Sequence, residues 1–342
     1  NDTGTILEDG TLTVSDGDGT STIAGASFVD SFSVSSQETV PISLAFNTDG
    51  TKMFVTGSFG KDVNEYTLTT GFDVSTASFV DSFSVYSQDS APTGLAFNTD
   101  GTKMFVTGAI GDDINEYTLS TGFDVSTASF VDSFDISSQE INAKGLAFNT
   151  DGTKMFVTGV TGDDVNEYTL TTGFDVSTAS FVDSFDISGQ ETSPYDLAFN
   201  TDGTKMFLVG YGGKDVNEYT LTTGFDVSTA SFVDSFSVSG QETGPTGLAF
   251  NTDGTKMFVA GVTGDDVNEY TLSTPFSLVN ISGEHTGDVI DSSNTSTRDT
   301  DVDVETLTVT AVRLGSSEGS GTAGTVGSAL TGTYGQLTLN SN

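Results

Sequence analysis

Apolar and polar residues alternate in short runs along most of the chain, and the same pattern returns at a fixed interval of 51 residues. The phrase LAFNTDGTKMF begins at Leu44, and it begins again at Leu95, Leu146, Leu197 and Leu248. A fixed period of this length is typical of repeat architectures, in which each copy buries its apolar side chains against the next copy.

One repeat contains four strand-like segments, at residues 43–47, 51–57, 62–70 and 78–85. The Asp-Gly pair between the first two segments is a strong signal for a tight β-hairpin. Residues 62–70 alternate with a period of two, as a β-strand does. No window keeps an apolar period of 3.6 residues, so the pattern predicts no helix.

Four antiparallel strands in about 50 residues form one blade of a β-propeller. The segment SFVDSF begins at Ser27, before the first LAFNTDG, and no sixth copy follows the last VNEYTL at Val267. This offset predicts a closed ring, in which residues 27–35 complete the blade whose other three strands lie within 246–273. We therefore predict an all-β fold whose main part, residues 23–280, is a five-bladed propeller closed by its N-terminal strand.

The five copies differ mainly in two segments. Before the first strand they read TVPIS, SAPTG, INAKG, TSPYD and TGPTG, and between the second and third strands SFGK, AIGD, VTGD, YGGK and VTGD. Both connections lie at the same end of a four-stranded blade, so they map onto one side of the ring, here called the varied face. The opposite side, here called the constant face, carries the NTDG turns and the nearly constant TGFDVST links.

The varied face is the candidate binding surface, because tyrosine rings beside hydrogen-bond donors suit sugars and peptides. The competing interpretation is that these loops differ because nothing restrains them. The fourth copy offers the densest patch, with two tyrosines, one carboxylate and one ammonium group: Tyr195, Asp196, Tyr211 and Lys214. Other copies place Phe59, Lys61, Tyr86 and Lys144 on the same face. We also expect one glutamine from each copy around a central funnel: Gln37, Gln88, Gln139, Gln190 and Gln241.

Composition narrows the possible partners. The net charge is -38, with only 10 Lys and Arg in 342 residues. Nucleic acids are excluded, because phosphate contacts need clustered Lys and Arg. No run of about 18 apolar residues is present, so we expect no membrane insertion. The absence of Cys excludes disulfides.

The repeat pattern also argues against catalysis. A general acid and a general base need different surroundings to separate their pKa values, whereas almost every Asp and Glu here occurs five times in equivalent surroundings. The single histidine, His285, lies outside the repeats. We therefore expect no enzyme, and a glycoside hydrolase is the weaker alternative.

The segments outside the repeats, at residues 1–22 and 281–342, carry different motifs. They include NDTGTILEDGTLTV, RDTDVDVETLTVTAV and GTAGTVGSALTGTYGQLTLN. These motifs resemble the VCBS and cadherin-like repeats of very large bacterial surface proteins, including RTX adhesins. The resemblance implies an immunoglobulin-like β-sandwich that is split by the propeller, incomplete at its C-terminus, and cut from a longer secreted chain with similar neighbouring domains.

The second flanking segment also contains a candidate calcium site. Asp299, Asp301, Asp303 and Glu305 alternate along a short acidic stretch, and Ca²⁺ prefers such oxygen ligands. The related family usually has Gly after the third Asp, whereas this chain has Val304. Glu8 and Asp9, or Asn1 and Asp2, could complete the site at a domain edge, and a solvated acidic loop is the alternative.

These observations together predict a monomeric, non-enzymatic binding module on the surface of a bacterial cell. Its varied face would hold a glycan or a peptide of another cell or surface, with calcium in the flanking domain. A rigid spacer that binds nothing is the alternative from another class.

Overall fold

The computed structural model describes residues 22–282 and the short segments 312–313, 323–326, 328, 330–332 and 335–337. The chain divides into two compact units, Ala24–Asn280 and a unit formed by Asn1–Ile23 with Ile281–Asn342. No helix among the described residues has the length and apolar character needed to cross a membrane. Outside the larger unit, the described strands form three short antiparallel pairs: β1 (Thr22–Ile23) with β22 (Ile281–Ser282), β23 (Val312–Arg313) with β24 (Ala323–Gly324), and β25 (Leu330–Gly332) with β26 (Gly335–Leu337).

The larger unit consists of five four-stranded antiparallel sheets, one for each repeat. Blade 1 contains β3 (Pro41–Phe46), β4 (Lys52–Gly57), β5 (Asp62–Leu68) and β6 (Ala77–Ser84). Blade 2 contains β7 (Pro92–Phe97), β8 (Lys103–Gly108), β9 (Asp113–Leu119) and β10 (Ala128–Asp135). Blade 3 contains β11 (Ala143–Phe148), β12 (Lys154–Gly159), β13 (Asp164–Leu170) and β14 (Ala179–Asp186). Blade 4 contains β15 (Pro194–Phe199), β16 (Lys205–Gly210), β17 (Asp215–Leu221) and β18 (Ala230–Ser237).

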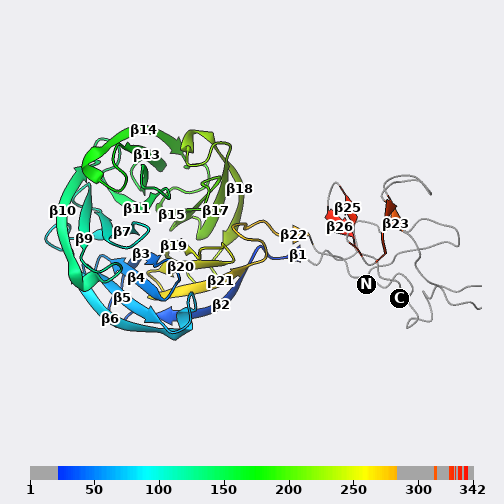
Figure 1. The fold of residues 1–342 in the computed structure, drawn as a ribbon, viewed down its shortest axis with the longest axis horizontal. Coiled ribbons are helices and arrows are strands. Elements are labelled where there is room, and N and C mark those ends of the chain that lie inside the picture. The colour runs from blue at the N-terminus through cyan, green and yellow to red at the C-terminus, as the bar shows by residue number, and fades with distance from the viewer. Residues whose placement is uncertain are drawn as a thin grey trace, which may run out of the picture. The chain divides into compact units, whose positions relative to one another are not determined.

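Blade 5 is assembled from both ends of the repeat region. Its inner strands are β19 (Pro245–Phe250), β20 (Lys256–Gly261) and β21 (Asp266–Leu272), and its outer strand is β2 (Ala26–Ser33). Strand β2 runs antiparallel to β21, with Ala26 opposite Leu272 and Ser33 opposite Asp266. The predicted closure by the N-terminal strand is therefore confirmed, and Figure 1 shows β2 on the outside of the ring beside β21.

The first strand of each blade lies at the centre of the ring, where it contacts the first strands of both neighbouring blades (Figure 1). Among the described residues, helical structure is confined to four single 3₁₀ turns, each just before an outer strand: η1 (Val74–Thr76), η2 (Val125–Thr127), η3 (Val176–Thr178) and η4 (Val227–Thr229). The prediction of an all-β, five-bladed propeller is thus confirmed.

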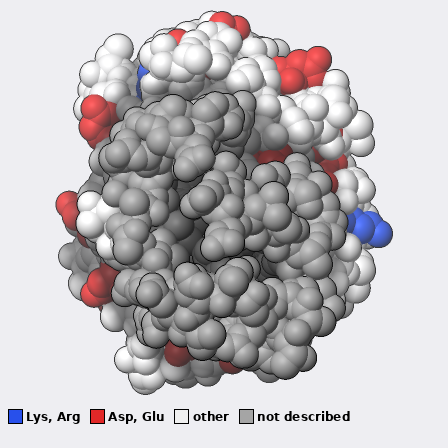
Figure 2. All heavy atoms as spheres, turned by 90° about the vertical axis from the view of Figure 1, so that its right-hand side faces the viewer, with Lys and Arg blue, Asp and Glu red and all other residues white. Residues whose placement is uncertain are grey.

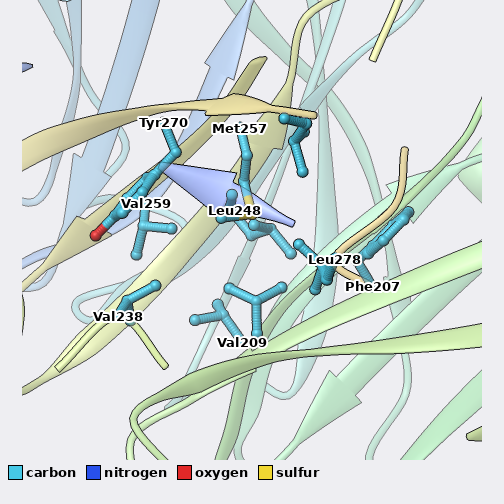
Figure 3. Packing of buried hydrophobic residues seen from close by; sticks show 11 residues of the cluster. Phe207, Val209, Val238, Leu248, Met257, Val259, Tyr270 and Leu278 are labelled. Atoms are coloured by element: carbon cyan, nitrogen blue, oxygen red, sulfur yellow. The ribbon is translucent and has the colours of Figure 1, made fainter. Parts of the chain in front are cut away.

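Apolar side chains fill the space between neighbouring blades. In Figure 3, Phe207 and Val209 of blade 4 meet Leu248, Met257 and Val259 of blade 5. Because every sheet is covered on both sides, even the polar positions of the third strand are buried, and Asn64 and Glu65 are at most 3% exposed. The alternating side chains of residues 62–70 therefore pack against two different neighbouring blades. The alternation does not separate buried from exposed positions.

An ion pair links each blade to the next at the constant face. The Lys52 ammonium donates to the Glu65 carboxylate at 2.7 Å and to the Phe123 carbonyl of blade 2 at 2.6 Å. The other Glu65 oxygen accepts from the Val125 N–H of that blade at 3.1 Å. We call this unit the Lys–Glu bridge. The bridge recurs with Lys103–Glu116, Lys154–Glu167, Lys205–Glu218 and Lys256–Glu269.

The repeated NTDG turn has its own packing requirement. Gly50 has a left-handed backbone, with φ of 70°. A Cβ atom at this position would also lie 2.3 Å from the ring of Phe72, which covers the turn. Both conditions require glycine, and they explain why the turn is identical in all five copies.

Candidate functional site

The loops of the varied face are held from inside by five buried acids. The Glu38 carboxylate accepts the N–H of Val40 at 2.7 Å and the N–H of Gly60 at 2.8 Å, so it ties both varied loops of blade 1 together. Burial raises the pKa of Glu38, and these N–H groups oppose the rise. Sequence reasoning missed this role, although the acid beside each glutamine recurs at a fixed position. The equivalent buried acids are Asp89, Glu140, Glu191 and Glu242.

The second residue of each central strand surrounds the axis at the varied face. Three of these positions are occupied by Ile42, Thr93 and Thr246, all at most 5% exposed. The Thr93 hydroxyl donates to the Ala143 carbonyl of the next blade at 2.8 Å, and Thr246 makes the equivalent bond to Pro41. The other two positions carry Lys144 and Tyr195. Blades 3 and 4, which are neighbours, thus carry large polar side chains at this position.

Lys144, Tyr195 and Tyr211 form one cluster, which we call the tyrosine patch. The Lys144 nitrogen lies 5.3 Å from the centre of the Tyr195 ring, and the two tyrosine rings are 6.2 Å apart with an interplanar angle of 41°. Tyr211 is 45% exposed, whereas Lys144 is only 8% exposed. Burial raises the pKa of Tyr195, and the neighbouring Tyr211 raises it further.

Two backbone features position Tyr211. Its N–H donates to the Ser193 carbonyl at 3.0 Å, which joins the two varied loops of blade 4. Its ring reaches blade 5, where a Cβ atom on Gly244 would lie 2.9 Å from the ring edge. The other blades have larger residues at this position: Val40, Ala91, Asn142 and Ser193. A glycine in blade 5 therefore provides the space that Tyr211 occupies.

Asp196 does not belong to the exposed patch, which corrects the sequence-based expectation. The residue is 2% exposed. Its carboxyl group accepts the Ser43 hydroxyl of blade 1 at 3.0 Å and the Leu248 N–H of blade 5 at 3.1 Å. It also accepts the N–H of Leu197 at 2.9 Å. Burial raises the pKa of Asp196 to about 8, and these three bonds oppose the rise.

The space for Asp196 exists because the equivalent positions of the other blades are small. They carry Ser43, Gly94, Gly145 and Gly247. A Cβ atom on Gly145 would lie 2.7 Å from the Asp196 Cα atom, so the centre of the ring is tightly packed there. A side chain at this position of the first strand points into the packed centre and not toward solvent.

The remaining predicted residues of the varied face lie in separate places. Lys61 contacts the exposed Tyr86, with its nitrogen 4.8 Å from the ring centre, and Phe59 is 70% exposed. Lys214 is exposed and has a left-handed backbone, with φ of 58°. No ion pair or cation–π contact in the described part of the chain joins Lys214 to the tyrosine patch.

The five glutamines do not surround a central funnel. Gln37 accepts from the Tyr66 hydroxyl at 3.4 Å, and Gln88 accepts from Tyr117 at the same distance, so both face the third strand of a blade. Gln139 is half-buried, and Gln190 and Gln241 are exposed. The sequence pattern correctly placed them on one edge, but it did not distinguish the first strand from the third.

A cavity of about 380 Å³ does lie on the axis, at the end where the central strands pass into the NTDG turns. Its wall is apolar and includes Leu44, Ala45, Phe46 and Phe72, and its rim includes Asn47 and Thr48. Equivalent residues of other blades complete the wall, so the cavity has nearly the same lining all round. None of the residues predicted for the varied face lines it.

The predicted calcium ligands Asp299, Asp301, Asp303, Glu305, Glu8 and Asp9 all lie outside the described residues. Within the described residues, no three His, Asp or Glu side chains are placed to hold a metal ion. Calcium binding stays a prediction.

No protein-family model matches the chain, and no curated protein matches it. Solved structures do match. A functionally unknown protein from Desulfotomaculum acetoxidans DSM 771 is 13% identical with a TM-score of 0.41, and the match covers 65% of this chain and 62% of that one. A proposed 6-phosphogluconolactonase from Bacteroides fragilis NCTC 9343 is 15% identical with a TM-score of 0.44, and the match covers 70% of each chain. The periplasmic gluconolactonase of Pseudomonas aeruginosa is 15% identical with a TM-score of 0.39, and the match covers 58% of this chain and 54% of that one.

These names contradict the prediction that the chain is not an enzyme. Two of the similar structures are named as lactonases, one of them only as a proposed one. At identities of 15% or less and TM-scores below 0.5, the similarity assigns no activity to this chain.

Proposed function

We propose that the propeller binds a carbohydrate at the tyrosine patch of its varied face. The observation that carries the proposal is the pair of tyrosine rings 6.2 Å apart, with the Lys144 amine beside one of them. Aromatic rings offer apolar faces on which a sugar ring can stack, and their hydroxyl groups can pair with sugar hydroxyls. The buried acids beneath the loops support this assignment, because a preorganised loop loses less entropy when a ligand binds.

A glycan array probed with the labelled protein tests the proposal. Tyr195→Ala and Tyr211→Ala are each expected to weaken binding about tenfold or more, because aromatic anchors commonly contribute ~2 kcal/mol or more. Thr201→Ala, in a turn of the constant face, is the matched control and should leave binding unchanged. Hits that both tyrosine variants retain would place the site elsewhere, and silence on the array would favour a peptide ligand or a spacer.

Hydrolysis of a lactone or a glycoside is the second candidate function. The observation in its favour is Asp196, a carboxyl group whose pKa is raised to about 8 by burial, as general acids often require. Its 2% exposure opposes direct contact with a substrate. Proton release from glucono-δ-lactone, compared between the parent and Asp196→Asn, tests this candidate. Turnover that the substitution abolishes would support an enzyme.

We further propose that the propeller is displayed outside a bacterial cell as part of an adhesin, with Ca²⁺ in the flanking unit. The support is the resemblance of the flanking motifs to VCBS and cadherin-like repeats, together with the alternating Asp299, Asp301 and Asp303. A cation that binds only the folded state stabilises it, so millimolar Ca²⁺ should raise the melting temperature of that unit. Asp301→Ala with Asp303→Ala should remove the increase, and an equal shift with Mg²⁺ would argue against the site.

A further inference from the structure

The lysines of the propeller fall into two groups. Five of them belong to the Lys–Glu bridges, with nitrogen–oxygen distances of 2.6–2.7 Å. The other three, Lys61, Lys144 and Lys214, all lie on the varied face, and residues 24–280 contain no arginine. The positive charge that is not used to join blades is thus confined to one side of an otherwise acidic ring. In Figure 2, acidic side chains (red) are scattered along the described part of the side that faces the viewer.

Lys144 differs from the other two lysines because its side chain is largely buried and has no hydrogen-bond acceptor. It is 8% exposed, and no hydrogen bond or ion pair in the described part of the chain occupies its ammonium group. Burial lowers the pKa of Lys144, while the charges of Glu140 and Asp89 oppose that change. The Lys144 nitrogen is not one of the buried polar atoms that lack a partner in the described residues, so this ammonium group still reaches solvent. An anion that arrives from solvent can therefore bind it without displacing another group.

The neighbouring acids are occupied by other groups. Glu140 accepts the N–H of Asn142 at 2.8 Å and the N–H of Gly162 at 3.4 Å. Asp89 accepts two N–H groups in the same way, and Asp196 is bonded to Ser43, Leu197 and Leu248. Glu140 and Asp89 lower the electrostatic energy of the Lys144 charge, but neither forms a direct bond with it. The donors of Lys144 are therefore available to a ligand.

We propose that the ligand of the tyrosine patch is an acidic sugar, whose carboxylate pairs with Lys144 while its ring stacks on the tyrosines. This inference rests on the proposed carbohydrate function and names the class of sugar. Charge-assisted bonds between an ammonium group and a carboxylate are roughly twice as strong as bonds between neutral groups. A chain with a net charge of -38 repels anions at long range, so an acidic ligand needs a local cation, and Lys144 provides it.

Calorimetric titration with trigalacturonate and with its neutral methyl ester tests this inference. The parent should bind the acid roughly tenfold more tightly than the ester, because only the acid forms the charge-assisted pair. Lys144→Thr places at this position the residue that blades 2 and 5 have there, and it should remove the preference while changing affinity for the ester less than about twofold. Lys144→Gln is the second variant, and both should melt within a few degrees of the parent.

Two further variants distinguish a failure of the acidic-sugar inference from a failure of the carbohydrate function. Lys214→Thr removes an exposed lysine of the same face and should reduce the preference by less than about twofold, because exposed charges act weakly at a distance. Tyr195→Ala should weaken binding of the acid and of the ester alike. Equal affinity of the parent for both probes, a preference that survives in Lys144→Thr, or no binding at millimolar acid would each overturn the assignment to acidic sugars. If array hits still depend on Tyr195 and Tyr211 in that case, the carbohydrate function itself stands.

Discussion

The constant face and the varied face are opposite ends of the same strands, yet they hold the ring together in different ways. At the constant face, the side chains of Lys52 and Glu65 bond to the main chain of the next blade. At the varied face, Glu38 bonds only to main-chain N–H groups. Nearly every residue offers such an N–H group, so the loops can change sequence without losing these bonds. The copies are therefore identical where a Lys–Glu pair joins two blades, and they vary where one carboxylate holds two loops of its own blade through main-chain N–H groups.

The largest effect is expected from removing the strand that closes the ring. Deletion of residues 25–36 takes away β2 together with the buried Ala26 and Val34. It also exposes the edge of β21, which can then pair with another chain. We expect aggregation or a large loss of thermal stability, measured by light scattering during a thermal melt. A synthetic peptide of residues 24–36 should restore part of the stability, and a deletion variant that melts as the parent does would contradict the closed ring.

A single Lys–Glu bridge should contribute less, but still measurably. Glu167→Ala removes the acceptor of the Lys154 ammonium and of the Val227 N–H. Loss of one partner of a fully buried pair lowers stability by about 3 kcal/mol, and we expect a smaller loss here because the Lys154 side chain is 27% exposed. The matched control is Lys214→Ala on the varied face, where we expect a change below about 0.5 kcal/mol because the side chain is exposed. Denaturant melts measure both values, and equal losses would remove the distinction between the two faces.

Much of the fold could be predicted because the repeats impose it. The offset between Ser27 and the strand at Val267 is a consequence of ring closure, so it is visible without coordinates. The location of the variable loops follows from strand order in the same way. The tyrosine patch was also predicted in part, since Tyr195 and Tyr211 belong to the two varied loops of one blade.

The sequence could not predict how far each side chain is buried. Asp196 and Tyr195 are neighbours in one strand, but Tyr195 reaches the surface while Asp196 is buried against Gly145 of blade 3. Lys144 joins the patch from a different blade, and that contact depends on the rotation between blades. The alternation pattern also did not reveal that Glu65 is buried, because the next blade covers it. All these errors arise from contacts between copies, which the pattern within one copy does not contain.

Asp196 predicts a pH effect on the stability of the propeller. Its pKa is about 8 in the folded protein and near the usual 3.8 in the unfolded chain. Between these values the folded state holds a proton that the unfolded state has released, so stability should fall as the pH rises from about 4 to about 8 and then level off. In Asp196→Asn this part of the slope should disappear. Melting temperatures across this range measure it, and parallel curves for parent and variant would show that Asp196 does not titrate there.

The smallest effect is expected at the buried tyrosines of the third strands, whose hydroxyl groups lie near the glutamines. The equivalent tyrosines differ in whether they bond to a glutamine. Tyr66 donates to Gln37 at 3.4 Å, whereas the buried hydroxyl of Tyr219 has no partner among the described residues. Tyr66→Phe should therefore lower stability by less than about 1 kcal/mol, because the lost bond is long. Tyr219→Phe should leave stability unchanged or raise it slightly, because it removes a polar atom that is buried without a partner. The two substitutions are chemically identical and occupy equivalent positions, so their difference isolates the contact with glutamine. Equal losses in denaturant melts would mean that the Tyr219 hydroxyl is also satisfied, for example by a buried water.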